Sequence, residues 1–170
     1  STFGNLRNYK ADQGDGLYRR SIYTIWKRTA APPSMLLFDA PNREICMPKR
    51  SRTNTPLQAL ALLNEVTYVE AARALAEKML SIESAKNSED RLILGYRLAT
   101  GSSPNAETLS ILQDGLNKRR KRFLENPEAA KSLINQGSST SRSGLDEVEL
   151  AAYTSTANIL LNLDRVIMKN

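Results

Sequence analysis

The sequence predicts a mainly α-helical fold, a compact bundle of five or six helices with a long proline-rich ordered connector and room for one short strand. Three observations lead to this class. Apolar residues recur every three or four positions along most of the chain after Thr55, which is the period of a helix packed on one side. Proline follows an N-capping residue at Thr55-Pro56 and at Asn126-Pro127. Apolar residues make up 41% of the 170 residues, which is enough to bury one core of ordinary domain size.

We expect residues 1–16 to form an arm or loop and residues 17–170 to form a single helical domain, the C-terminal part of a larger multidomain protein. The first segment is rich in Gly, Asn and Asp and has no apolar period. Residues 17–29 are ambiguous between helix and strand, and the helical neighbours favour a helix slightly. Either structure would place the same three apolar side chains in the core: Ile22, Ile25 and Trp26.

The connector, residues 32–55, is the most irregular part of the sequence. Pro32 and Pro33 end the preceding element, and the apolar string SMLLF follows as a short tether. A polar turn and a further proline then keep the chain irregular up to Thr55. Connectors of this length are uncommon in compact domains and are usually functional or disordered.

Helices are predicted for the rest of the chain. Thr55 N-caps a helix that Pro56 begins, and residues 64–67 are either a break between two helices or a polar notch in one. Four further helices are expected at residues 88–100, 105–125, 126–136 and 145–168, with a flexible polar loop at 137–144. The apolar faces of these helices include Leu57, Leu60, Val69, Ala72, Ala76, Met79, Leu92, Tyr96, Leu116, Phe123, Leu150 and Ala157.

Composition excludes several classes of chemistry. The chain has no histidine, so it cannot by itself build a Ser-His-Asp or Cys-His catalytic site, or a zinc or haem site that depends on histidine. The single Cys46 cannot form an internal disulfide, and we expect it to be a small buried side chain. We predict no metal site, no cofactor in this chain, and no membrane span, since no apolar run approaches the roughly 18 residues that a span needs.

Asp39 and Glu44 have two interpretations. As carboxylates separated by a short turn, they could act as a general acid and base, as in glycoside hydrolysis. Alternatively, they pair with nearby arginines and hold the connector against the helices. The arginines favour the second interpretation, because they lower carboxylate pKa values and so oppose a general acid. The predicted structural network consists of Arg28, Asp39, Arg43, Glu44, Arg50, Arg52, Asn54 and Thr55.

The run KRRKR, together with a net charge of +6, makes anion binding a further hypothesis. On a helix these five side chains point around most of the cylinder, so only two or three could follow one phosphate backbone. A position near a helix C-terminus also favours a solvated helix end stabilised by the macrodipole. Anion or nucleic-acid binding through this run is therefore the weaker interpretation, and nucleic acid is not an expected partner. The residues concerned are Lys118, Arg119, Arg120, Lys121 and Arg122.

Two long strings in the sequence resemble a known family. YRRSIYTIWKRTAAPPSMLLFDAPNRE and RTNTPLQALALLNEVTYVEAARALA are similar to a planctomycete-specific C-terminal domain of unknown function, number fifteen fifty-three in its series. The similarity continues more loosely through GYRLATGSSPNAETLSIL and ELAAYTSTANILLNLDRVI. The resemblance implies a large exported parent protein with a second domain of unknown function and often a planctomycete-type cytochrome c domain. Any haem would then belong to that other domain, and the resemblance supplies no catalytic residues.

From the residues and the resemblance we expect a non-catalytic accessory or interaction module of a large multidomain protein, associated with a haem protein and located in the cell envelope or outside the cell. The expected partners are sibling domains of the parent chain, a polysaccharide or another protein. The alternative function is a carbohydrate-active enzyme domain that uses Asp39 and Glu44.

Overall fold

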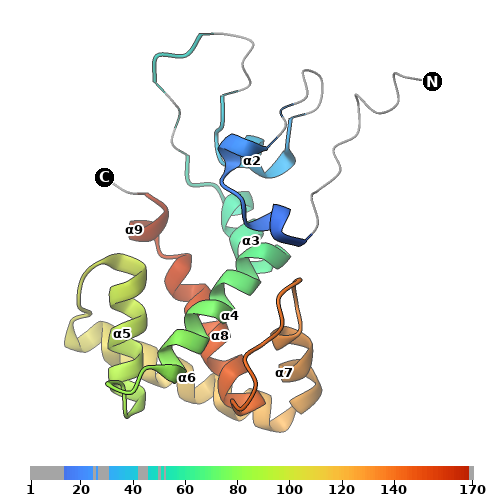
Figure 1. Ribbon diagram of the computed structural model, residues 1–170. Coiled ribbons are helices and arrows are strands. Elements are labelled where there is room, and N and C mark those ends of the chain that lie inside the picture. Colours follow the sequence, from blue (N-terminus) through green and yellow to red (C-terminus); the bar gives the residue numbers. More distant parts are fainter. Residues whose placement is uncertain are drawn as a thin grey trace. The chain divides into compact units, whose positions relative to one another are not determined.

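The computed structural model describes residues 14–24, 26, 31–41, 46–49, 51 and 53–168 (Figure 1). The chain divides into two units, Ser1–Gln58 and Ala59–Asn170, which are described separately. All regular secondary structure in the described ranges is helical, and none of them contains a strand. The mainly α-helical class with a bundle of helices is confirmed, whereas the optional short strand does not occur in these ranges.

Within the helix expected over residues 17–29, the described residues 17–24 form short helical turns and not one continuous helix. Two 3-10 helices, η1 (Gly14–Tyr18) and η2 (Ser21–Tyr23), are separated by extended backbone at Arg20. The expected core position of Ile22 is wrong, because its side chain is 81% exposed. Trp26 is only partly buried, and Ile25 lies outside the described residues. The β-branched and aromatic density of this segment therefore does not indicate a helix with a buried face.

The apolar string SMLLF is also helical. Helix α2 (Pro33–Leu37) begins with proline at its first position, where a missing N–H costs nothing. It ends at Asp39, whose φ of +58° lies in the left-handed region that Asp tolerates better than most residues. The amide of Ala40 donates to the carbonyl of Met35 at 2.9 Å, which is the six-to-one hydrogen bond of a Schellman motif. The predicted tether is thus a single capped helical turn.

Helix α3 (Pro56–Asn64) begins where the sequence predicts and starts with a reciprocal capping box. The Gln58 amide donates to Thr55 Oγ1 at 3.3 Å, and the Thr55 amide donates to Gln58 Oε1 at 2.9 Å. Residues 64–67 are a true break, because Glu65 is extended and α4 (Val66–Ser81) begins after it. Leu57 and Leu60 were expected on a buried stripe, but both side chains are exposed. Gln58 is instead the buried residue of α3.

The second unit continues with capped helices at the predicted places. Their bounds are α5 (Ser88–Thr100), α6 (Ala106–Glu125), α7 (Pro127–Ile134), α8 (Glu147–Leu161) and α9 (Asp164–Ile167). The first four each have an N-cap side chain that accepts a hydrogen bond from the amide three residues later, at 2.8 to 3.1 Å. These caps are Asn87, Asn105, Asn126 and Asp146.

The last predicted helix is interrupted. It was expected to run to Met168, but α8 ends at Leu161 and the backbone of Leu163 is extended before α9 begins. The side chain of Asn162 donates to the carbonyl of Ala59, 3.5 Å away. The chain therefore turns at a polar residue that bonds another helix.

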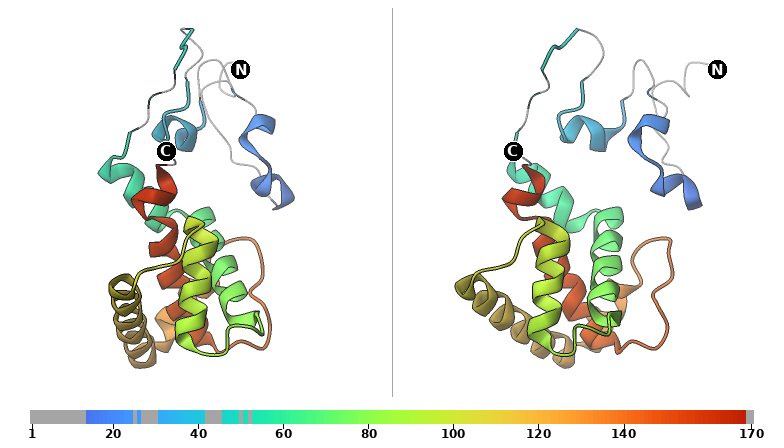
Figure 2. Two further views of the ribbon diagram at one scale, coloured as in Figure 1. Left: turned by 90° about the vertical axis from the view of Figure 1, so that its left-hand side faces the viewer. Right: turned by 60° about the vertical axis from the view of Figure 1, so that its left-hand side comes forward.

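Helix α8 lies at the centre of the second unit, in contact with α4, α5, α6, α7 and α9 (Figures 1 and 2). Most of its circumference is buried, as expected for a helix enclosed by others. The core combines residues of α8 with residues of four other helices, and the predicted faces of α4, α5 and α6 contribute to it. These buried residues are Ala72, Ala76, Met79, Leu92, Leu116, Phe123, Ala130, Ile134, Leu150, Ala151, Ala152, Tyr153 and Ala157. None of the described helices is long and apolar enough to cross a membrane.

Two buried threonines on α8 give a test of the core. Thr154 and Thr156 are both fully buried, but only Thr156 has a partner, donating to the carbonyl of Ala152 at 2.8 Å. The hydroxyl of Thr154 has no hydrogen bond. Because burying an unsatisfied hydroxyl costs free energy, we expect Thr154→Val to raise the free energy of unfolding by about 1 kcal/mol.

The matched control is Thr156→Val, which removes a satisfied hydroxyl from the same helix. We expect it to be neutral or to lower the free energy of unfolding by about 1 kcal/mol. Urea unfolding of both variants provides the measurement. Equal effects of the two substitutions would contradict the difference in hydrogen bonding.

Candidate functional site

Asp39 belongs to a hydrogen-bonded cluster that joins the two ends of the connector. Its Oδ2 accepts hydrogen bonds from the amide and the hydroxyl of Thr53, both at 2.7 Å. The same Thr53 hydroxyl accepts a bond from Gln58 Nε2 at 2.9 Å. Gln58 Nε2 also donates to the carbonyl of Leu37 at 2.8 Å. The connector is therefore closed by a buried amide at the start of α3.

The predicted carboxylate pair and arginine network stay predictions. Glu44 and the four arginines of that network, Arg28, Arg43, Arg50 and Arg52, lie outside the described residues. Asn54 is exposed, and Thr55 takes part in the capping box. The cluster instead contains Thr53 and Gln58, which sequence reasoning missed. The spacing T-P-L-Q, a capping-box pattern, is the signal that could have found Gln58.

Cys46 is exposed, so the expectation of a buried side chain is wrong. In the sequence it follows the polar turn of the connector, away from any predicted helix. Among the described residues, no group of three or more His, Cys, Asp or Glu side chains is placed to hold a metal ion.

A second polar network, also missed from the sequence, anchors the loop 137–144 to α4. Glu70 and Arg73 are buried, and Arg73 lies 3.5 Å from Glu70 and 3.8 Å from Glu77. The amide of Ser139 donates to Glu70 Oε1 at 2.6 Å. Arg73 donates to four oxygens at the end of α7 and in the segment that follows it: Ile134 O, Gln136 O at 3.1 Å, Ser139 O at 2.8 Å and Ser139 Oγ at 2.6 Å.

The loop was expected to be flexible, but its backbone is tied to this buried arginine and two glutamates. The amide of Arg142 donates to Glu77 at 3.1 Å, which adds a third attachment. Gly137 has φ +102°, and a Cβ on it would lie 2.6 Å from the Glu70 carboxyl carbon. The spacing of Glu70, Arg73 and Glu77 on one helix face is the only signal in the sequence, and it does not identify the loop as the partner.

The basic run of α6 divides into two groups. Arg120 makes a two-pronged ion pair with Glu149 of α8, with its Nε at 2.7 Å from Oε1 and its Nη2 at 2.9 Å from Oε2. The hydrogen bonds that Arg120 donates to Glu149 raise the pKa of Arg120 despite partial burial. Arg120 also donates to Ser88 at 2.9 Å and lies over the Tyr153 ring, 5.6 Å from its centre. Arg120 thus joins three helices and is not a free basic side chain.

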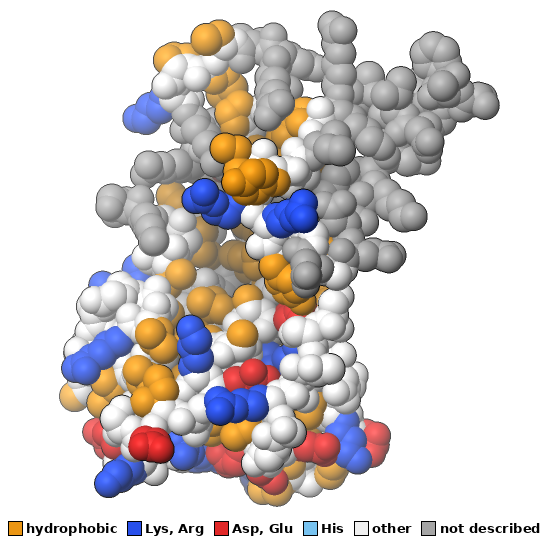
Figure 3. Space-filling model, viewed as in Figure 1, with side chains coloured by type: hydrophobic (Ala, Val, Ile, Leu, Met, Phe, Trp, Pro, Cys, Tyr) orange, Lys and Arg blue, Asp and Glu red, His pale blue; other side chains and the backbone are white. Residues whose placement is uncertain are grey.

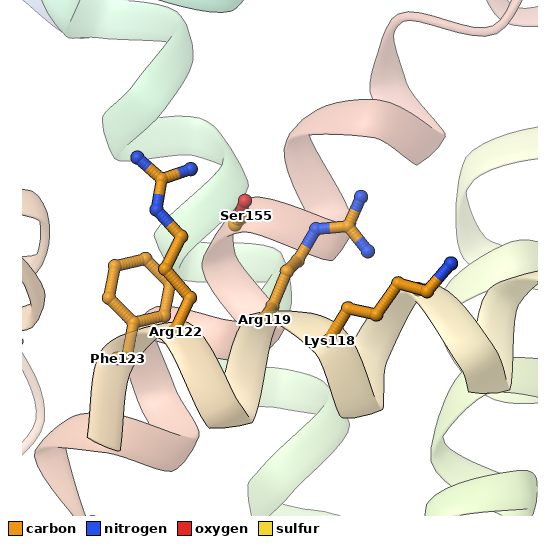
Figure 4. Close-up of a pocket in the computed structure, with 6 residues that line it drawn as sticks. Lys118, Arg119, Arg122, Phe123 and Ser155 are labelled. Carbon is orange, nitrogen blue, oxygen red and sulfur yellow. The ribbon is translucent and has the colours of Figure 1, made fainter. Parts of the chain in front are cut away.

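Three other members of the run line a hollow of about 340 Å³ between α6 and α8. Figure 4 shows Lys118, Arg119 and Arg122 extending from one side of α6, with Ser155 on α8 beyond them. Gly115 and Phe123 complete the lining. Lys121 is exposed and does not line the hollow. The structure therefore brings together three of the five residues of the predicted basic run; this hollow is called the basic pocket below.

An apolar face lies where α3 meets the C-terminal end of α8. Asn158 Nδ2 donates to the carbonyl of Leu63 at 3.1 Å, next to the bond from Asn162 to Ala59. Beside these bonds three large apolar side chains stay exposed, with exposed fractions of 56, 41 and 38%. They are Leu60, Leu63 and Ile159, and this group is called the α3 face below. In Figure 3 the acidic and basic side chains of the helical unit are interspersed with apolar ones.

The fold and these sites define a helical domain with a closed connector, a buried loop anchor, a basic pocket and an exposed apolar face. A protein-family model described as PSD1, "Protein of unknown function (DUF1553)", matches residues 2–116, which is more than half of the chain. The chain belongs to this family. Searches of the curated proteins and of the solved structures found no match.

Proposed function

We propose that this chain is a non-catalytic interaction module of a larger protein, and that it docks through the α3 face onto another domain of the same parent polypeptide. The observation that carries this proposal is the exposure of Leu60, Leu63 and Ile159 beside two hydrogen bonds that fix α3 against α8. Exposed leucine and isoleucine side chains that gather on one face are typical of a protein interaction site.

The core supports the same proposal. The second unit buries thirteen side chains in one cluster without using any side chain of the α3 face. Exposed apolar side chains that do not serve the core are expected to contact something else, or to be scattered singly. Here three of them flank the same pair of hydrogen bonds, which favours a common partner surface.

The experiment compares amide hydrogen exchange in this chain alone and in the parent polypeptide. We expect the amides of residues 59–66 and 157–162 to exchange more slowly in the parent, because docking buries them. The double variant Leu60→Asp, Leu63→Asp should return their exchange in the parent to the rate of the isolated chain, without changing the helix content of either.

Ile111→Asp is the control, because Ile111 is also exposed, at 64%, but stands on α6 away from the α3 face. It should leave the exchange difference unchanged. Equal exchange of the two segments in the chain and in the parent would refute the docking proposal.

The proposed location is the cell envelope or the exterior, with any haem in a sibling domain. This part rests on the resemblance of the sequence strings alone. Fractionation of cells that express the parent protein, followed by detection of a tag at its C-terminus, tests it; recovery in the cytoplasmic fraction alone would refute it.

A further inference from the structure

The basic pocket is a cationic face of α6 that packing does not explain. Its lining residues on this helix follow the spacing i, i+3, i+4 and i+7, so they share one side: Gly115, Lys118, Arg119 and Arg122. On the same helix Asp114 lies one turn before Lys118, and Glu125 lies one turn after Arg122. In the described part of the chain, none of the three cationic side chains has an ion pair or a hydrogen bond, in contrast to Arg120.

Arg119 is the most constrained of the three. It is half-buried, and this burial lowers the pKa of Arg119 because it removes water from the guanidinium. Its guanidinium lies back against Gly115, where a Cβ would be only 2.7 Å from Nη1. A glycine at mid-helix is unfavourable relative to alanine, and here it leaves space for the arginine head beside the hollow.

We propose that the basic pocket binds a tetrahedral oxyanion, phosphate or sulfate, carried on a small organic group. Two guanidinium groups and one ammonium group supply the charge-assisted donors that such an anion requires. Ser155 adds a hydroxyl from the facing helix, and the ring of Phe123 supplies an apolar wall. The hollow of about 340 Å³ is of the size that holds a small organic ligand and exceeds what an inorganic anion fills.

The arrangement favours a small ligand over nucleic acid. A nucleic-acid backbone needs a long row of cations along a groove, whereas here only three, spaced along one side of α6, line the hollow (Figure 4). Arg120, which would have extended the row, is held by Glu149. The proposal concerns α6 and is independent of the α3 face.

The test is an NMR titration of the whole chain, labelled with ¹⁵N, with phenyl phosphate and phenyl sulfate at pH 8 and constant ionic strength. The two probes share one organic group and separate the doubly charged phosphate from the singly charged sulfate. We expect at least one of them to shift the amides of residues 115–123 and 155, and inorganic phosphate to bind more weakly than phenyl phosphate. Tighter binding of the phosphate ester would assign a phosphate ligand, and tighter binding of the sulfate ester a sulfate ligand.

Three variants make the site assignment specific. Arg119→Gln and Arg122→Gln should each weaken binding at least about tenfold, because each removes a charged donor from the pocket. Lys121→Gln makes the same change in net charge on the same helix outside the pocket, and it should change the affinity less than about twofold. Circular dichroism and melting temperature show that each variant is folded.

Gly115→Ala is expected to change ligand binding and fold stability in opposite directions. Alanine favours the helix, so we expect the melting temperature to rise, while displacement of the Arg119 head weakens binding. The proposal is overturned if neither ester shifts these amides. It is also overturned if Lys121→Gln weakens binding as much as Arg119→Gln, or if a short oligonucleotide binds this helix more tightly than either ester.

Discussion

Arg73→Met is expected to lower the free energy of unfolding by about 3–5 kcal/mol, the largest loss from any single substitution considered for this chain. Removing one partner of a buried ion pair typically costs that much, and here it takes the guanidinium away from the buried carboxylate of Glu70. The substitution also leaves the oxygens of the turn at residues 134–139 without their donor. Since a domain of this size is stable by only about 5–15 kcal/mol, much of its stability would be lost.

Two measurements follow this substitution. Urea unfolding gives the free energy of unfolding, and trypsin cleavage after Arg142 under native conditions reports on release of the loop 137–144. The free energy of unfolding of Arg73→Lys should lie between that of Arg73→Met and that of the natural chain. An ammonium group keeps the charge, but it cannot reach the oxygens that the guanidinium fork reaches.

Lys131→Met is the matched control for charge removal. Lys131 lies 3.8 Å from Glu128, but both side chains are largely exposed, so the pair contributes little. We expect Lys131→Met to change the free energy of unfolding by less than about 0.5 kcal/mol. An equal loss in the Arg73 and Lys131 variants would mean that the buried network does not hold the loop.

Gln58→Leu is expected to open the connector without unfolding the second unit. The leucine fills a similar volume but removes two donors and one acceptor, leaving the Leu37 carbonyl, the Thr53 hydroxyl and the Thr55 amide without this partner. Each buried polar group left unsatisfied costs about 1–3 kcal/mol. If the free energy of opening the connector falls by about 2 kcal/mol, the amides of residues 33–40 and 53–55 should exchange roughly thirtyfold faster.

Two further variants give this prediction its controls. Gln58→Glu keeps an acceptor for the Thr55 amide but loses both donors, so it should open the connector while α3 keeps its cap. Gln113→Leu places the same change on α6 and should leave exchange in the connector as it is. If Gln58→Leu did not alter exchange at residues 33–40, the closing role of this amide would be refuted.

Local signals in the sequence predicted most of the helical unit. The caps at Asn87, Asn105, Asn126 and Asp146 depend only on the next three residues, so their chemistry can be read without knowing the fold. The apolar period likewise identified the core positions of α4, because a helix turns at a fixed rate. The apolar period alone could not predict that Leu57 and Leu60 are exposed, since a regular apolar stripe does not show whether another element covers it.

The sites depend on residues that are far apart in the sequence. Arg73 and Ser139 are 66 positions apart, and Arg120 and Glu149 are 29 apart. No spacing rule connects such pairs, because they meet only through the packing of α4, α6 and α8. Helical spacing could place Lys118, Arg119 and Arg122 on one face. It could not show that Arg120 is occupied by a carboxylate or that the other three border a hollow.

The central position of α8 has a consequence for the order of folding. The helices that it contacts, apart from α9, all precede it in the chain, so during synthesis they emerge with their apolar sides uncovered. Met79, Leu92 and Leu116 can be fully enclosed only after residue 161 has left the ribosome. The family match ends at residue 116, so the helix that completes this core lies outside the matched region. The growing chain therefore exposes these apolar surfaces until α8 has been synthesised.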